Sequence, residues 1–453
     1  MHGPFAKGTN RIGVQVVGPG DFTGPITNAA GGVITVKGDN SYGISVETNM
    51  TGNLSNLGSL SIAGLNSIGI RTLGKVAGDV TLGGTVAAGG PGTQAVNLGD
   101  DVSGALLING AVSSSGYRYT TRSTDPNFLK LLAADDLLQG GPTVTVAGSV
   151  GKGILVDASS TTDSSGVVTT VAGSITASGA ASALMGGGAA GHDVQIGNVA
   201  TGADAFGIEI KGSVAGAGVY DGVAAQGMQL GVAGGGAVDT GGGVRVTGVV
   251  SASSYAAGAT ALQINSGVSA PVVRNEGHIT AIMNSDAVGA SARAIDIGAG
   301  AQTAALQNSG SITAAVAGEK ADGIAISDKS GTLSEIENTG TIVVSRTFTD
   351  LSQAVTGKDV AMDLSANTGG VHIIQALASP TSTAPQISGA VLLGSGSDRV
   401  EILSGTLNGD LSLGAGANTL NIDGGASVSG ALTAQGGTLG LSVGAGTLRI
   451  NSP

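Results

Sequence analysis

Asn275-Glu276-Gly277-His278-Ile279 returns twice further along the chain, as Asn308-Ser309-Gly310-Ser311-Ile312 and as Asn338-Thr339-Gly340-Thr341-Ile342. The three copies begin 33 and 30 residues apart. In each copy the turn-forming residues Asn and Gly precede an apolar Ile, which predicts a corner followed by a strand. A short unit that recurs at a loose period is typical of repeat proteins, in which successive units stack on one another.

A second repeated unit places Gly or Ala before an apolar, a polar and an apolar residue, the alternation of a strand with one buried face. Its first copies, Gly43–Val46, Gly69–Thr72 and Ala95–Leu98, follow one another at intervals of 26 residues. The later copies are spaced less evenly; they are Gly153–Val156, Gly207–Ile210, Gly227–Leu230, Gly243–Val246, Ala261–Ile264, Ala294–Ile297, Gly323–Ile326 and Ala361–Leu364. We therefore expect short strands joined by turns of variable length.

The composition of the 453 residues agrees with a stack of narrow coils. Hydrophobic residues make up 41% of the chain, yet aromatic residues contribute only 2% and Trp is absent. Small and β-branched aliphatic side chains suit a slim interior, whereas a compact core normally uses large rings. Charged residues amount to 11%, too few for a solvated disordered chain, and no run of 18 apolar residues predicts a membrane-spanning helix.

Charge and metal-ligating residues exclude several kinds of partner. The net charge of −12 argues against nucleic acid, because binding to nucleic acid depends on Lys and Arg. The absence of Cys excludes a disulfide framework and thiolate metal sites. The four histidines are scattered and form no His-Glu-x-x-His motif; they are His2, His192, His278 and His372. We accordingly expect no metal and no cofactor.

Together the repeats predict an all-β fold, a right-handed parallel β-helix (a β-solenoid) with a short helical insertion. With roughly 25–30 residues per coil and ~4.8 Å between stacked strands, the rod would be about 70–80 Å long. A β-sandwich is the alternative, but two-residue hairpin turns are scarce and the repeats run in one sense. Residues 1–385 are expected to form the body, and 386–453 a more regular and more stable set of C-terminal coils.

Residues 112–142 interrupt the repeats. Asp125-Pro126 is a typical helix start, residues 128–138 have helix-forming composition, and Gly140-Gly141-Pro142 ends the segment. We expect an apolar helix face made of Phe128, Leu131, Leu132 and Leu138. The insertion either packs on the flank of the rod, or caps a gap, or projects as a recognition element. The candidate residues of such an interaction element are Tyr117, Arg118, Tyr119, Arg122 and Phe128.

No catalytic residue is predicted. Gly440-Leu441-Ser442-Val443-Gly444 matches Gly-x-Ser-x-Gly, but a nucleophile elbow needs a following helix and a partner His, and this motif lies in a Gly-rich strand ladder. Carboxylates that could act on a polysaccharide come without aromatic rings to stack sugars; they are Asp100, Asp101, Asp193, Asp204, Glu209 and Asp221. An ice-binding surface would need a regular Thr ladder, of which only Thr143-Val144-Thr145 predicts a rung.

One segment resembles part of a calcium-binding repeat. Gly394-x-Gly396-x-Asp398 matches half of the calcium-roll nonapeptide, but the next copy has Asn418 in place of the acid. Calcium takes six to eight oxygen ligands, which one Asp cannot supply, so the segment predicts a corner.

The Asn-x-Gly-x-Ile-Thr repeats, the Gly-Ile-x-Ile strands and the Gly-rich corners near the C-terminus resemble the passenger domain of Gram-negative autotransporters, the proteins of type V secretion. Ser115–Tyr119 and Ala134–Gly141 resemble an alphaproteobacterial subset. The resemblance covers most of the chain. It implies a β-helix displayed at the cell surface or outer membrane, or released from it. A C-terminal outer-membrane β-barrel translocator would be its partner, and residues 386–453 would assist folding as an autochaperone-like cap.

The ends of the sequence lack two parts of such a protein. Met1-His2-Gly3-Pro4 does not resemble the start of a signal peptide, and no amphipathic barrel strands follow Pro453. We therefore expect an excised or cleaved passenger.

Three classes of function remain. The first is a structural or adhesive protein for surface attachment, cell–cell contact or biofilm formation, contacting a glycan, a host or abiotic surface, or another copy. It is favoured because exposed Ser, Thr, Asn and Gln offer many weak hydrogen bonds. The alternatives are a polysaccharide-processing hydrolase or lyase, and a stalk that presents another domain.

Overall fold

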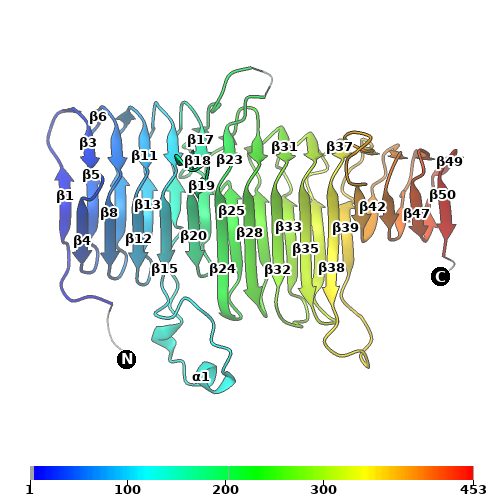
Figure 1. The fold of residues 1–453 in the computed structure, drawn as a ribbon, viewed down its shortest axis with the longest axis horizontal. Helices are drawn as coiled ribbons and strands as arrows, with labels where there is room; N and C mark the ends of the chain where they lie inside the picture. Colours follow the sequence, from blue (N-terminus) through cyan, green and yellow to red (C-terminus); the bar gives the residue numbers. More distant parts are fainter. Residues whose placement is uncertain (1–4, 203, 452–453) are drawn as a thin grey trace.

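Each coil of the chain contributes one strand to each of three long parallel sheets, which the computed structural model describes for residues 5–202 and 204–451. Each sheet has 14 strands, and neighbouring strands within a sheet come from successive coils (Figure 1). The sheets are called first, second and third in the order in which the chain enters them.

The first sheet contains β1 (Ile12–Val16), β5 (Tyr42–Val46), β9 (Ile68–Thr72), β13 (Gln94–Leu98), β16 (Val144–Val146), β21 (Ser182–Gly186), β25 (Ala225–Leu230), β29 (Ala259–Ile264), β33 (Ser291–Ile297), β36 (Asp322–Asp328), β39 (Asp359–Leu364), β42 (Ala390–Leu393), β45 (Leu411–Ser412) and β48 (Leu432–Thr433). The second contains β3 (Ile26–Asn28), β7 (Leu54–Asn56), β11 (Val80–Leu82), β14 (Leu106–Ile108), β17 (Ile154–Val156), β23 (Ile208–Ile210), β27 (Val244–Val246), β31 (Val272–Asn275), β34 (Ala305–Asn308), β37 (Glu335–Asn338), β40 (His372–Gln375), β43 (Arg399–Ile402), β46 (Ala417–Ile422) and β49 (Thr438–Val443). The third contains β4 (Val33–Lys37), β8 (Ser59–Ala63), β12 (Thr85–Gly89), β15 (Ala111–Ser115), β20 (Ser174–Ser178), β24 (Ser213–Asp221), β28 (Val249–Tyr255), β32 (His278–Met283), β35 (Ser311–Ala317), β38 (Thr341–Thr347), β41 (Gln386–Ser388), β44 (Thr406–Asn408), β47 (Ser427–Gly430) and β50 (Thr447–Ile450).

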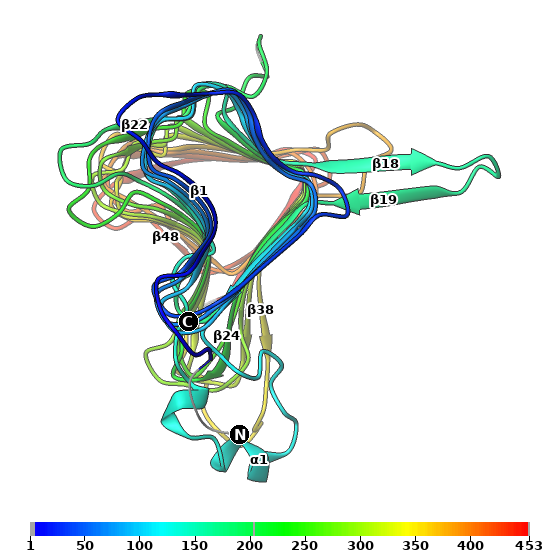
Figure 2. The ribbon, with the colours of Figure 1, turned by 90° about the vertical axis from the view of Figure 1, so that its left-hand side faces the viewer.

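Two short three-stranded sheets line the turns between the first and second sheets. They consist of β2 (Phe22–Thr23), β6 (Met50–Thr51) and β10 (Val76–Ala77), and of β22 (Val194–Gln195), β26 (Val238–Asp239) and β30 (Val268–Ser269). The antiparallel hairpin of β18 (Ala158–Thr162) and β19 (Val168–Ala172) projects from the rod (Figure 2).

The helix is right-handed. Seen from the N-terminal end, the chain runs up β1, across the top and down β4 as it recedes from the viewer (Figure 2). The structure therefore confirms the predicted right-handed parallel β-helix. Its handedness follows the right-handed rule for connections between parallel strands.

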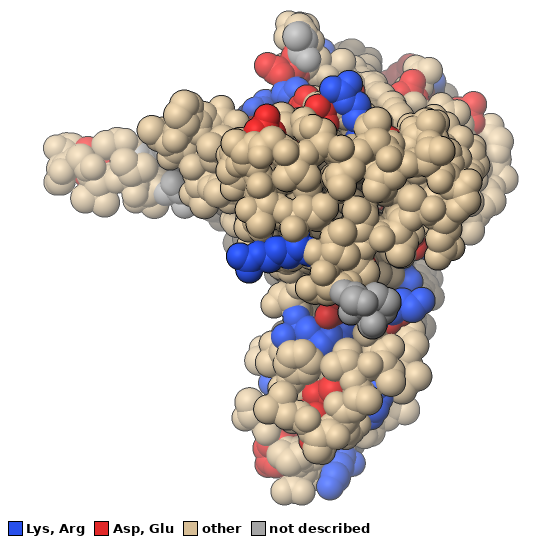
Figure 3. All heavy atoms as spheres, turned by 90° about the vertical axis from the view of Figure 1, so that its right-hand side faces the viewer, with Lys and Arg blue, Asp and Glu red and all other residues tan. Residues whose placement is uncertain are grey.

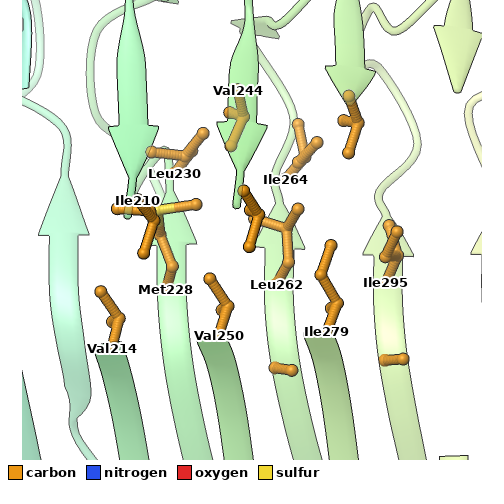
Figure 4. Packing of buried hydrophobic residues seen from close by; sticks show 14 of the residues in the cluster. Ile210, Val214, Met228, Leu230, Val244, Val250, Leu262, Ile264, Ile279 and Ile295 are labelled. Carbon is orange, nitrogen blue, oxygen red and sulfur yellow. The ribbon is translucent and has the colours of Figure 1, made fainter. Parts of the chain in front are cut away.

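The interior is filled by columns of aliphatic side chains. Met228, Leu262 and Ile295 occupy equivalent positions in three successive coils of the first sheet, and all three are fully buried (Figure 4). Each such side chain contributes about 1.5–3 kcal/mol by leaving water. Three converging sheets leave room for residues of this size, which accounts for a core built without Trp.

The Asn-x-Gly-x-Ile motif forms the corner between the second and third sheets. Asn308 ends β34 and is buried, and Ile312 is the first inward residue of β35. Between them, Gly310 lies so close to the previous coil that an added Cβ would overlap the carbonyl oxygen of Gly277. Gly340 meets the carbonyl oxygen of Gly310 in the same way. The motif therefore combines a buried amide, a close backbone approach and a core residue.

The rod is shorter than the sequence predicted. Thirteen spacings of ~4.8 Å between 14 strands give about 62 Å. The expected 70–80 Å is wrong because insertions lengthen the middle coils: 48 residues separate the paired Val96 and Val144. The C-terminal coils are the short ones, with 20 residues between Val391 and Leu411. The three sheets run on without a break past residue 385.

The insertion departs from the expected helix. It contains only α1 (Pro126–Lys130) and the 3₁₀ turn η1 (Ala134–Asp136). Asp125 caps α1 by accepting a hydrogen bond from the backbone N–H of Asn127, which confirms the predicted start. The predicted apolar face is correct for Leu132, which packs toward the rod together with Leu129, and wrong for Leu131, which is 78% exposed. These helical turns, the only ones in the described part of the chain, are too short to cross a bilayer.

Candidate interaction surfaces

The outer face of the third sheet carries two columns of small polar side chains along the whole rod. In each column nine of fourteen residues are Ser or Thr, and none of the 28 is buried. The first column is Val33, Ser59, Thr85, Ala111, Ser174, Ser213, Val249, His278, Ser311, Thr341, Gln386, Thr406, Ser427 and Thr447. The second is Thr35, Ser61, Ala87, Ser113, Thr176, Ala215, Ser251, Thr280, Thr313, Val343, Ser388, Asn408, Ser429 and Arg449.

We call these two columns the hydroxyl face. Arg449, in the last strand, is the only Lys, Arg, Asp or Glu in either column. Strand spacing sets the hydroxyl groups at ~4.8 Å along the rod, and the two columns lie two residues apart across it. Apart from Arg449 the face therefore presents uncharged, mostly hydroxyl-bearing side chains on a protein whose net charge is −12.

A groove of about 450 Å³ hollows the hydroxyl face where the insertion leaves the rod. Its floor comes from β8, β12, β15 and β20, with Ser61, Ser113 and Thr176 among the floor residues. Tyr117 and Thr120 of the insertion line it as well. The insertion thus adds a wall to a face that is otherwise open.

Two tyrosines anchor the insertion to the rod. The ring of Tyr117 meets the ring of Tyr220 edge to face, with 5.0 Å between the centroids, and both residues are 3% exposed. The Tyr117 hydroxyl donates to the carbonyl oxygen of Gly218 at 2.9 Å, and the Tyr220 hydroxyl donates to that of Tyr119 at 2.7 Å. Burial raises the pKa of Tyr117, so its hydroxyl keeps the proton that it donates.

Two basic residues of the insertion, Arg122 and Arg118, also make contacts within the protein. Arg122 donates to the carbonyl oxygen of Val219 at 3.1 Å, pairs with Asp221 at 2.9 Å, and lies over the ring of Tyr255. Arg118 lies over the ring of Phe5 and 3.8 Å from Asp136.

The predicted interaction element is therefore brought together, but largely by internal contacts. Phe128 meets Tyr119 edge to face at 5.4 Å and is half-buried. Of the five predicted residues, Tyr119 is the one whose side chain is exposed. The structure shows the insertion both packed on the flank of the rod and projecting from it (Figures 1 and 2).

Each of the six candidate carboxylates has a partner: Glu209 lies 3.8 Å from Lys211, and Asp100 accepts a hydrogen bond from the backbone N–H of Asp101. Asp101 pairs with Lys75, Asp204 with Arg274, and Asp221 with Arg122. Asp193 accepts a hydrogen bond from the backbone of Ala237. Within residues 5–202 and 204–451 no group of three His, Asp or Glu is placed to hold a metal ion.

A second hollow, of about 300 Å³, lies on the second sheet and is lined by residues of both charges. Arg274, Glu276 and Glu337 line it together with Gln307. Arg274 donates to Gln307 and to Asp204, so part of its hydrogen-bonding capacity is already used.

Asp398, the acid of the partial calcium motif, faces the interior. It is 2% exposed, and its Oδ1 accepts a hydrogen bond from the backbone N–H of Val371 at 2.8 Å. Its Oδ2 is buried without a hydrogen-bond partner in the structure. Burial raises the pKa of Asp398 to about 6. Asp398 therefore lies in a buried corner of the coil, as the sequence predicted.

Comparison with protein-family models, with curated proteins and with solved structures gave no match. The proposal for the function therefore depends on the surfaces described above.

The hydroxyl face is the feature that the sequence analysis missed. Its members, such as Ser113 and Thr176, lie 63 residues apart in the sequence and align only once strand register is known. Thr143 and Thr145, the one pair that resembles a rung of a Thr ladder in the sequence, are both buried. The signal that was available is the Ser or Thr that follows many of the Gly-x-Ile and Gly-x-Val corners, as Thr280 and Thr313 do.

Proposed function

We propose that this protein is a structural and adhesive rod that attaches to an uncharged polysaccharide through its hydroxyl face. The observation that carries the proposal is this face, 14 strands long and interrupted by one charged residue at its end. Each hydroxyl group contributes a weak hydrogen bond, and many together give a multivalent contact. An uncharged glycan needs no counter-charge, which agrees with the near absence of ionic groups.

The groove at the insertion supports the same proposal. It narrows the open face to a channel of about 450 Å³ between a floor of small residues and the wall at Tyr117 and Thr120. Small floor residues let an extended polymer approach the backbone closely. The resemblance to autotransporter passenger domains suggests where the protein acts: it would be displayed on the surface of a Gram-negative bacterium, or released from it, after export through an outer-membrane barrel.

Co-sedimentation of the full chain with microcrystalline cellulose and with chitin tests the proposal. We expect the wild-type protein to sediment with at least one polymer. The double variant Ser61→Lys, Ser113→Lys places two charges in the groove and should reduce binding at least tenfold. Ser55→Lys, a half-buried outward residue of β7 on the second sheet, is the matched control and should bind as wild type.

Equal binding by the double variant and the control would overturn the proposal. Release of soluble sugars from either polymer would instead support the alternative of a polysaccharide-processing enzyme.

A further inference from the structure

The most exposed large apolar side chains of the described residues share one edge of the rod. They are Leu351, Val288 and Leu131, with 88%, 82% and 78% of their surface exposed. Each lies in a connection from the third sheet to the first: between β38 and β39, between β32 and β33, and between β15 and β16. In Figure 1 these connections form the lower edge, and the first and last of the three loops along the chain project farthest. We call this the apolar edge.

The two longer loops carry further exposed apolar side chains. Phe348 and Val355 accompany Leu351, with 51% and 49% exposed, and Leu138 accompanies Leu131. The strands β15 and β38 are the fourth and tenth of the third sheet, so six spacings of ~4.8 Å separate the loops by about 29 Å along the rod. Isolated exposed apolar residues are ordinary, but this concentration along one edge is typical of an interaction site.

The apolar edge is locally neutral on an acidic protein. Residues 116–141 hold three basic and three acidic residues, residues 348–358 hold one of each, and residues 284–290 hold one acid, Asp286, whose partner Lys320 lies in the next coil. Several of the charges near the edge pair with each other: Lys320 with Asp286 at 3.4 Å, and Arg346 with Asp359 at 2.6 Å. Figure 3 shows basic and acidic side chains intermixed over this lower projection.

We propose that the apolar edge docks on a lipid bilayer with zwitterionic headgroups. A partner protein would need a row of pockets matched to loops that leave the rod at strands about 29 Å apart, whereas the apolar layer of a membrane accepts side chains at any spacing. Lys130, exposed beside Leu131, can extend its ammonium group to a lipid phosphate while its stem stays among apolar groups. Anionic headgroups are disfavoured because the chain as a whole is negatively charged.

Flotation of the full chain with phosphatidylcholine vesicles tests this proposal. We expect the wild-type protein to float and the double variant Leu131→Ser, Leu351→Ser to lose at least tenfold in vesicle partitioning. The matched control is Val17→Ser, Val33→Ser, which removes two side chains that are 67% and 72% exposed in the first coil, away from the loops. The control should float as wild type. A wild-type protein that stays with the soluble fraction, or a double variant that floats like the control, overturns the proposal.

A fluorescence measurement gives an independent readout, because the chain contains no Trp. The emission of the variant Leu351→Trp should shift to shorter wavelength when vesicles are added, and the emission of Val33→Trp should not. Unchanged emission at position 351 overturns the proposal. So does stronger binding to phosphatidylglycerol than to phosphatidylcholine. A dimer in sedimentation velocity that depends on Leu131 and Leu351, without vesicle binding, assigns the edge to a second copy instead.

Discussion

The side chain of Asn275 donates from Nδ2 to Oδ1 of Asn308 at 2.8 Å inside the corner between the second and third sheets. Asn308 donates in turn to Asn338 at 2.8 Å, and Asn338 to Gln375 at 2.9 Å. All four amides are buried. The repeated Asn of the sequence motif is therefore a hydrogen-bonded ladder that ties four successive coils together.

Replacing Asn308 with Ala should break the ladder at its centre. The Nδ2 group of Asn275 loses its side-chain acceptor and keeps the carbonyl oxygens of Gly277 and Ser311. The Oδ1 of Asn338 loses its side-chain donor and keeps only the backbone N–H of Gly340, at 3.3 Å. Each of these two buried hydrogen bonds is worth about 0.5–1.5 kcal/mol, so we expect the free energy of unfolding to fall by about 1–3 kcal/mol. Urea unfolding followed by circular dichroism measures this. Asn421→Ala, on the outer face of β46, is the control, and a loss no larger than that of the control would contradict the ladder's role.

Gly310→Ala tests the close approach of the coils at the same corner. The new Cβ would overlap the carbonyl oxygen of Gly277, so the two coils must separate locally. Overpacking of this kind costs about 1–3 kcal/mol. The control is Gly18→Ala, since nothing lies within 4 Å of a Cβ placed there. Hydrogen exchange should show faster opening of β34 and β35 in the Gly310 variant alone; unchanged protection would contradict the steric argument.

The corners were predictable because their physical requirements are local in the sequence. A buried amide, a residue without a side chain and an inward Ile follow one another within five positions, as in Asn308 to Ile312. The alternation of apolar and polar residues also predicted the strands, because each strand must point apolar side chains into the core of the rod.

The candidate surfaces depend on contacts that the sequence does not display. Tyr117 and Tyr220 meet although they lie 103 residues apart. The helical composition of residues 128–138 was overridden, since packing of Leu129 and Leu132 on the rod ends α1 after Lys130. Insertions of different length also shift the period, so that the hydroxyl columns emerge only from the strand register.

Asp398 should make the C-terminal coils less stable as pH rises. Its pKa is raised to about 6 in the fold, above the unfolded value of about 3.9, so the folded state binds the proton more tightly. The stabilisation is present below pH 4 and is lost as pH rises through 6. The difference corresponds to about 2–3 kcal/mol at neutral pH.

Asp398→Asn should remove this dependence, because a neutral amide cannot ionise. Asn418 already occupies the equivalent position of the next coil, where its amide donates to the carbonyl oxygens of Leu413 and Ala415. Urea midpoints between pH 4 and pH 8 should therefore diverge, with the variant more stable at the upper end. The exposed Asp410→Asn is the control. Parallel pH profiles for wild type and Asp398→Asn would refute the assignment.

The two tyrosine hydroxyl groups should decide how firmly the insertion is held. Tyr117→Phe removes the hydrogen bond to Gly218, and Tyr220→Phe removes the bond to Tyr119, while both rings stay in place. Each loss is worth about 1–1.5 kcal/mol and acts on the opening of the insertion rather than on the rod. Because Lys130 is exposed in this segment, the rate of tryptic cleavage after Lys130 should rise about 5–10-fold in either variant. Tyr42→Phe in β5, remote from the insertion, should leave that rate unchanged. If cleavage after Lys130 is as slow in both variants as in wild type, the edge-to-face ring contact alone holds the insertion, and the hydroxyl groups contribute nothing measurable.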